Sequence, residues 1–435
     1  MSAQNVIAAR VADIAQRTPW RTRGRVAVWI AGALLAALIV AVTMLLAKGT
    51  GIWGLDRPVM WGLAIANYVW WIGMGMAGTF ISAALLLLRQ DWRASVNRFA
   101  EAMTVFAVSV SGLFPIFHLG RPWFFYWVAP YPNAMGTWPQ WRSSLTWDFF
   151  AISAYLIVSI VYWYIGMLPD LATLRDAATT QRQRYFYGFL ALGWRGASTQ
   201  WRAHASAARL LAGLAVPLVF SVHTMVALDF SQGIVAGWHS SLFGPFFVGG
   251  ALFSGFAMTL VLAIVLRRAF ALDRLITDTD LDRLAKLLLA VGIFVAYCYA
   301  VELLIPFYSG DAQEIAATTA RFDGPFAWLY WLTLICNVVV PQALWSPTVR
   351  RNRGALLVIG TTVVVGMWLE RFMLIVTSLY RSYLPSVEGR YWPTVWDWLL
   401  LIGSIGLFIA MFLLFVRLLP VVSVYELRKR REQTA

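Results

Sequence analysis

Residues 26–47 read VAVWIAGALLAALIVAVTMLLA, a run that carries no charged side chain. At about 1.5 Å of rise per residue, a helix of this length crosses the roughly 30 Å of hydrocarbon in a bilayer. A helix is expected because a backbone in hydrocarbon must satisfy its own hydrogen bonds, and the run is far longer than a barrel strand. It is also longer than the apolar region of a signal peptide, and no A-x-A site follows it. We therefore expect it to be retained as the first transmembrane span.

The composition extends this expectation to the whole chain. Of 435 residues, 60% are apolar and 13% are charged, against roughly 45–50% and 25% in soluble domains. A soluble protein cannot bury so much apolar surface, and disordered chains are poor in apolar residues. We predict an all-α polytopic membrane protein whose ten spans cover residues 26–47, 59–88, 97–119, 145–167, 206–228, 242–266, 284–306, 325–346, 355–380 and 396–420.

The net charge of +14 is read first as a topology signal. Most of the 35 basic residues lie at alternate span ends, beginning with the N-terminal segment, and Arg371 lies within a span. By the positive-inside rule, both termini are cytoplasmic, and nucleic acid is not an expected partner. The predicted organisation is an amphipathic N-terminal segment at 1–25, a membrane domain at 26–420 and a basic tail at 421–435. The opposite span ends hold only Lys48, Arg57, Arg121, Arg142, Arg321, Arg381 and Arg390.

Several kinds of cofactor chemistry have no sequence signal. The two cysteines, Cys298 and Cys336, lie within spans and lack the spacing of a zinc site or an iron–sulfur cluster. Neither a phosphate-binding GxxxxGK[ST] loop nor a GxGxxG fingerprint occurs. Gly73, Gly75 and Gly78 lie inside a span, where small residues allow close helix packing. We therefore expect no metal site, haem or iron–sulfur cluster in this chain.

Ionisable side chains within spans are the main candidates for function, because burying their charge is expensive. These ionisable side chains are expected in the outer half of the bilayer, except for the adjacent pair Glu370 and Arg371, which lies at mid-depth. This distribution suggests a proton-handling site that is reached from the outer side. The other candidates are His118, Arg121, Asp148, His223, Asp229, His239, Glu302 and Asp397.

His118 and Asp148 stand out because one loop joins the two helix ends that carry them, so their side chains can converge. A histidine beside a carboxylate suits proton transfer from a hydroxyl group. One alternative is that His118 and His223 are axial ligands of a haem. For Glu370 and Arg371 the alternative is a static role, with each side chain finding a separate partner because neighbours in sequence point to different sides of a helix.

Several runs resemble the NrfD/PsrC-type quinone-interacting membrane subunits. They are His118-Leu-Gly-Arg121-Pro-Trp123, Tyr126-Trp127, Trp147-Asp148-Phe149, Ser221-Val-His223 and Gly237-Trp238-His239. The later runs Asn337-Val-Val-Val-Pro341-Gln342 and Trp368-Leu-Glu370-Arg371-Phe372 are most similar to the ActC-type subunit of bacterial alternative complex III.

The resemblance implies two four-helix bundles, formed by spans two to five and six to nine, with the first and last spans at their flanks. It also implies a quinol pocket near the outer face of the first bundle. His118 and Asp148 match the family's pocket residues, and Arg121, Trp123 and Tyr126 are the further quinol-binding candidates. The implied substrate is menaquinol or ubiquinol, in the inner membrane of a bacterium.

The implied function is quinol oxidation as a subunit of a respiratory oxidoreductase that is not active alone. The expected partners are an iron–sulfur subunit on the outer face, c-type cytochrome subunits, a sister NrfD-like subunit and a terminal oxidase. Proton translocation would use His223, Asp229, His239, Glu302, Glu370 and Arg371. The alternatives are a quinone-free scaffold or proton-conducting subunit of such a complex, the anchor of a polysulfide or nitrite reductase, and a secondary transporter.

Overall fold

The computed structural model describes residues 22–129, 141–238, 240–380, 389, 391–427 and 429. In this part of the chain every regular element is helical, and ten helices are long and apolar enough to span a membrane. The predicted all-α fold and the ten spans are thereby confirmed. The spans are α2 (Thr22–Lys48), α3 (Leu63–Leu87), α4 (Asn97–His118), α5 (Ser144–Asp176), α7 (Ser198–Ser231), α8 (Phe243–Phe270), α9 (Asp278–Ser309), α11 (Ala327–Leu334) with its continuation to Trp345, α13 (Arg353–Phe372) with its continuation to Thr377, and α14 (Val395–Leu418).

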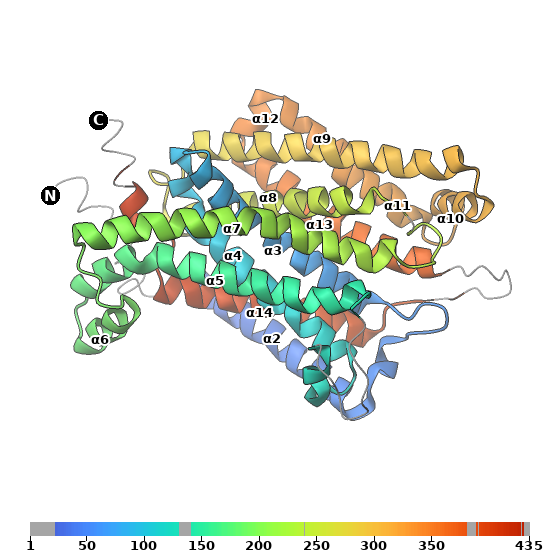
Figure 1. The fold of residues 1–435 in the computed structure, drawn as a ribbon, viewed down its shortest axis with the longest axis horizontal. Helices are drawn as coiled ribbons and strands as arrows, with labels where there is room; N and C mark the ends of the chain where they lie inside the picture. The colour runs from blue at the N-terminus through green and yellow to red at the C-terminus, as the bar shows by residue number, and fades with distance from the viewer. Residues whose placement is uncertain are drawn as a thin grey trace.

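The spans form two bundles side by side. Helices α3, α4, α5 and α7 make the first bundle, and α8, α9, α11 and α13 make the second. Helix α3 also packs against α8 and α13 and so joins the bundles. Helices α2 and α14 pair with each other along the flank of the first bundle (Figure 1).

Because successive spans alternate in direction, the connecting segments gather at two ends. We call the end with residues 88–96, 177–197, 271–277 and 346–352 the basic end, because it carries most of the arginines. Figure 1 shows α6 (Gln181–Leu190) at this end and α10 (Ala312–Asp323) at the opposite end. The cytoplasmic location of the basic end remains a prediction, and the predicted amphipathic segment at 1–21 lies outside the described residues.

Glycines bring the helices of the first bundle into backbone contact. A Cβ atom on Gly78 of α3 would lie 1.9 Å from the carbonyl oxygen of Ala100 on α4. A Cβ atom on Gly75 would lie 2.9 Å from a methyl group of Val108. Close packing at these two glycines is therefore confirmed, and it holds α3 against α4 along the bundle's core.

The eighth span is irregular. After α11 it continues as a π-helical turn, η4 (Ile335–Val339), and a 3₁₀ turn, η5 (Val340–Trp345). Pro341 has no backbone N–H to donate, so the regular hydrogen-bond pattern cannot continue through it. Gly366 of α13 accommodates this turn, since a Cβ there would lie 2.2 Å from the side-chain oxygen of Asn337.

Residues 168–205, which connect the predicted spans 145–167 and 206–228, are largely helical. Helix α5 continues to Asp176, α7 begins at Ser198, and α6 lies between them with a capping box at Thr180. Hydropathy marks only the part of a helix that lies in lipid, so the polar extensions at the basic end carried no signal.

We predict that Gly78→Val destabilises the protein by about 1–3 kcal/mol or more, because the new side chain overpacks the α3–α4 contact. Thermal unfolding of the purified protein, followed by fluorescence-detected size exclusion, measures the effect.

Gly32→Val is the matched control, since Gly32 is also a glycine inside a span and a Cβ atom added to it would have no described neighbour within 4 Å. Equal thermal stability of the two variants would contradict the packing role of Gly78.

Candidate functional site

Asp148 and Asp229 meet at the end of the first bundle that lies opposite the basic end. Asp148 lies near the start of α5, Asp229 lies near the end of α7, and their carboxyl groups interact directly. Ser144 of the same helix as Asp148 lies beside Asp229. From α3, the hydroxyl group of Tyr68 donates to Oδ2 of Asp148 at 3.3 Å. Three helices therefore supply one buried polar cluster. We call Asp148 and Asp229 the carboxyl pair, and Tyr68 is the third member of the cluster.

This cluster has unused hydrogen-bonding capacity. Asp148 is 7% exposed, and its Oδ1 and the Oδ1 of Asp229 are both buried with no hydrogen-bond partner among the described residues. Buried polar atoms in proteins usually have partners, so these two orphaned acceptors indicate a place for a donor. Two carboxyl groups in contact also favour holding a proton between them, because two carboxylates would repel each other. The cluster can thus accept or release a proton.

His118 occupies a different position from the carboxyl pair. It is the last residue of α4, and its ring stacks on Trp53 with centroids 6.0 Å apart and planes 10° apart. Within the described part of the chain, its buried Nδ1 has no hydrogen-bond partner. The structure gives Asp148 the partners Tyr68 and Asp229, and among the described residues no hydrogen bond or ion pair joins it to His118. The two predicted residues lie at the same end of the bundle but do not pair directly.

The other predicted quinol-binding residues lie at the surface. Arg121, Trp123 and Tyr126 are in or next to the 3₁₀ turn η3 (Pro122–Val128) that follows α4, and all three are exposed. Trp123 and Tyr126 are 56% and 46% exposed. They border a loop whose residues 130–140 lie outside the described part of the chain.

His223 is fully enclosed at the junction of the bundles. Its Nε2 lies 3.8 Å from the position of a Cβ on Gly73, and Arg371 acts on it electrostatically. It lies about two turns from the end of α7, whereas His118 ends α4, so a haem held between the two rings does not fit this arrangement. His239 lies outside the described residues.

Glu370 and Arg371 form an ion pair with one another. Their side-chain atoms are 3.1 Å apart, so the expectation that they point away from each other is wrong. Each also has a further partner: Tyr299 donates to Oε2 of Glu370 at 2.6 Å, and the guanidinium of Arg371 lies 4.3 Å from the ring centroid of Phe247. Asn337, on the π-helical turn of the eighth span, donates to the Tyr299 hydroxyl at 2.9 Å.

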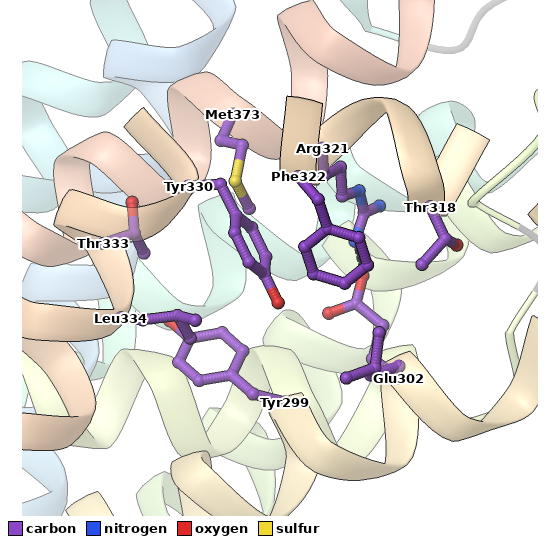
Figure 2. A pocket seen from close by; sticks show the side chains of 10 residues that line it. Tyr299, Glu302, Thr318, Arg321, Phe322, Tyr330, Thr333, Leu334 and Met373 are labelled. Atoms are coloured by element: carbon purple, nitrogen blue, oxygen red, sulfur yellow. Dashed lines mark hydrogen bonds and ion pairs between the residues drawn. The ribbon is translucent and has the colours of Figure 1, made fainter. Parts of the chain in front are cut away.

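Glu302 is linked to the same region. Arg321 of α10 pairs with it at 2.8 Å, and both line a cavity of about 10 Å³ with Tyr299 (Figure 2). This volume is close to the minimum for one water molecule. Burial lowers the pKa of Arg321, but the Glu302 carboxylate more than offsets this, so the pKa lies above its ordinary value. Tyr299 therefore stands between two predicted residues, Glu302 and Glu370.

Two groups of buried polar residues were not predicted from the sequence. Tyr68 and Tyr299 carry no charge, although the polar pair Asn67-Tyr68 inside an apolar run was an available signal. The second group is at the basic end, where ionisable side chains are also buried: Arg93, Arg98, Glu101 and Asp170. The expectation that buried ionisable groups lie in the outer half, apart from Glu370 and Arg371, is therefore wrong.

Three known proteins are similar to this chain in sequence. The chain is 26% identical to a putative dimethyl sulfoxide reductase membrane subunit of Halobacterium salinarum, over 80% of this chain and 78% of the relative. It is 24% identical to a selenate reductase subunit of Mesobacillus selenatarsenatis, over 88% and 91% of the two chains. It is 23% identical to an Hdr-like menaquinol oxidoreductase integral membrane subunit of Archaeoglobus fulgidus, over 86% and 87%.

The sequence model of the polysulphide reductase NrfD family matches residues 51–382, which include both bundles. Members of this family are multi-pass membrane subunits of oxidoreductases that interact with quinones. With ten membrane-spanning helices and a match over most of its length, this chain belongs to the NrfD family.

Proposed function

We propose that this chain oxidises quinol at the opposite end of the first bundle, facing the outer side of the membrane. The observation that carries the proposal is the convergence of Asp148, Asp229 and Tyr68 with two carboxyl oxygens that have no partner among the described residues. Quinol presents two hydroxyl donors, which match orphaned acceptors in a buried, largely apolar setting. The orphaned Nδ1 of His118 is a further acceptor at this end.

The proposed chemistry divides between this chain and its partners. Oxidation of quinol releases two protons and two electrons. The carboxyl pair accepts one proton, with the Tyr68 hydroxyl orienting Asp148, and His118 accepts the other. The electrons leave to a partner, for which we propose an iron–sulfur subunit on the outer face and then c-type cytochrome subunits.

For the type of complex we propose an alternative complex III-like assembly, with this chain as its ActC-type subunit beside a sister NrfD-like subunit, and a terminal oxidase as a further partner. A second candidate is the membrane anchor of a reductase, which is favoured by the names of the dimethyl sulfoxide and selenate reductase relatives. The Archaeoglobus relative favours menaquinol as the substrate.

Proton translocation is proposed through the second bundle. Arg321 pairs with Glu302, both line the small cavity with Tyr299, and the Tyr299 hydroxyl donates to Glu370. Arg371 connects this line of residues to His223 on the first bundle. The rival role, a static set of buried pairs, uses the same contacts but moves no proton.

Asp148→Asn and Asp229→Asn are expected to lower quinol oxidation by about 10²-fold or more, because each removes a group that accepts a proton. His118→Ala is expected to lower it similarly, and Tyr68→Phe by about tenfold. Quinol-dependent reduction of the acceptor by the purified complex measures this.

Asp56→Asn removes an exposed carboxyl group near the same end and is the control, with unchanged turnover. The set of subunits that purifies with each variant shows whether assembly is intact. Wild-type turnover in both Asp148→Asn and His118→Ala would rule out the proposed site.

Glu370→Gln and Tyr299→Phe are expected to lower the number of protons released per electron in proteoliposomes, with quinol oxidation continuing. Both variants interrupt the line between Glu302 and Arg371 and leave the carboxyl pair intact. A wild-type ratio in both variants would support the static role. The static role would also be supported if the ratio measured in the wild-type complex is fully explained by the protons that quinol releases.

The type of complex is tested on the assembly purified from its host. An alternative complex III-like assembly is expected to show c-type haem bands that quinol reduces. Quinol oxidation that depends on added selenate or dimethyl sulfoxide, in a preparation without those bands, would instead identify a reductase anchor.

A further inference from the structure

Five charged side chains are gathered at the basic end of the first bundle, away from the proposed quinol site. We call them the Glu101 cluster: Arg93, Arg98, Glu101, Asp170 and Glu426. Glu101 lies one turn inside α4 and is 3% exposed. Arg98 and Asp170 are each 1% exposed. Charges so enclosed need either a partner or a proton.

Both arginines in the cluster have carboxylate partners other than Glu101. Arg98 bonds Asp170 at 3.0 Å and the carbonyl oxygen of Gly166 at 2.7 Å. Arg93 pairs with Glu426 from the C-terminal segment. Burial lowers the pKa of Arg93, but the neighbouring Glu426 carboxylate more than offsets this, so the pKa lies above its ordinary value. The formal charges of the two arginines are balanced by those of Asp170 and Glu426, and Glu101 is the surplus carboxyl group.

The contacts of Glu101 fit a carboxyl group that binds a proton. Its Oε1 is hydrogen bonded to Ser82 of α3, and its Oε2, 3.5 Å from Arg98, is buried with no hydrogen-bond partner in the described part of the chain. From each packed element one polar or charged group faces Glu101: Ser82 on α3, Arg98 on α4, Tyr162 on α5, Arg93 before α4, and Glu426 in the C-terminal segment.

A line of hydroxyl groups leads from Glu101 into the membrane. Ser82 lies 3.2 Å from the hydroxyl of Tyr162, and one turn further Thr79 donates to Ser159 at 3.2 Å. The hydroxyl of Tyr155 follows, and it donates to the carbonyl oxygen of Met76 at 3.1 Å. The line covers roughly 10 Å of α3, since seven residues each rise about 1.5 Å.

The C-terminal segment lies over the cluster. Asn97 donates to Oε2 of Glu426 at 3.0 Å, and the backbone N–H of Tyr425 donates to Asp170 at 3.1 Å. Glu426 is the most accessible member of the cluster, with a side chain 22% exposed. The part of the predicted basic tail that the structure describes is therefore docked on the bundle and separates Glu101 from solvent at the basic end.

We propose that Glu101 is a proton-binding site of the first bundle, which exchanges its proton with the solution at the basic end past Glu426, the most accessible member of the cluster. Ser82 and Tyr162 hydrogen bond within the site. Only a proton moves: it binds the surplus carboxylate and leaves by the same route. The site lies at the other end of the bundle from the carboxyl pair, and the inference does not rest on quinol oxidation.

Infrared difference spectroscopy of the purified complex tests the site directly. Spectra are recorded between acidic and alkaline buffer without quinol, in the stretching region of protonated carboxyl groups. One band in this region is expected to be lost completely in Glu101→Gln and to be retained at a shifted frequency in Glu101→Asp. Asp148→Asn is the matched control and keeps the band, which separates this site from the proposed quinol site.

Ser82→Ala provides a second measurement if Glu101→Gln does not assemble. It removes the hydrogen bond to Oε1 and is expected to shift the same band. A Glu101→Gln spectrum identical to that of the wild type would overturn the proposal. So would a band that moves in neither Ser82→Ala nor Tyr162→Phe.

Discussion

Hydrocarbon offers no hydrogen-bond partner to a polar group, and this constraint governs the whole molecule. The backbone satisfies this constraint by forming helices, and polar side chains satisfy it by contacting one another across helix interfaces. Such contacts need helices that approach closely, which the contact of Gly78 with Ala100 permits between α3 and α4. Where a polar atom remains without a partner in so demanding an environment, a transient partner is the natural explanation. The orphaned atoms of Asp148, Asp229, His118 and Glu101 all have this character within the described structure.

Under the proposed function, the polar groups fall into regions with different tasks. The carboxyl pair with Tyr68 deals with the substrate at one end of the first bundle. The line from Glu302 to Arg371 lies in the second bundle, and His223 stands where the two bundles meet. His223 and Arg371 are both buried and interact electrostatically, so a change of charge on one acts on the other with little screening. The junction between the bundles is thus the place where redox chemistry and proton movement can influence each other.

The sequence was sufficient for the spans because each is a long apolar run that must be a helix in lipid. It was also sufficient to select Asp148 and Asp229, since a carboxyl group within a span is rare. It did not pair them, because their contact depends on how α5 packs against α7, and no local pattern records that packing. Glu101 was missed for another reason: it lies so near the start of its span that it resembles an interfacial residue, although the C-terminal segment covers it. Tyr68 and Tyr299 were missed because an uncharged tyrosine within a span does not carry the cost of burying a charge.

The contacts between α3 and α5 share one numerical property. Tyr68 with Asp148, Gly75 with Tyr155, Thr79 with Ser159, and Ser82 with Tyr162 are all separated by 80 residues. The two helices run in the same direction with one fixed alignment. If α5 slid along α3 by one turn, roughly 5.4 Å, Asp148 would face Ile72, Ser159 would face Ala83 and Tyr162 would face Leu86. These polar contacts thus fix the axial register of α3 against α5, so any proton transfer in the first bundle takes place without the two helices sliding past each other.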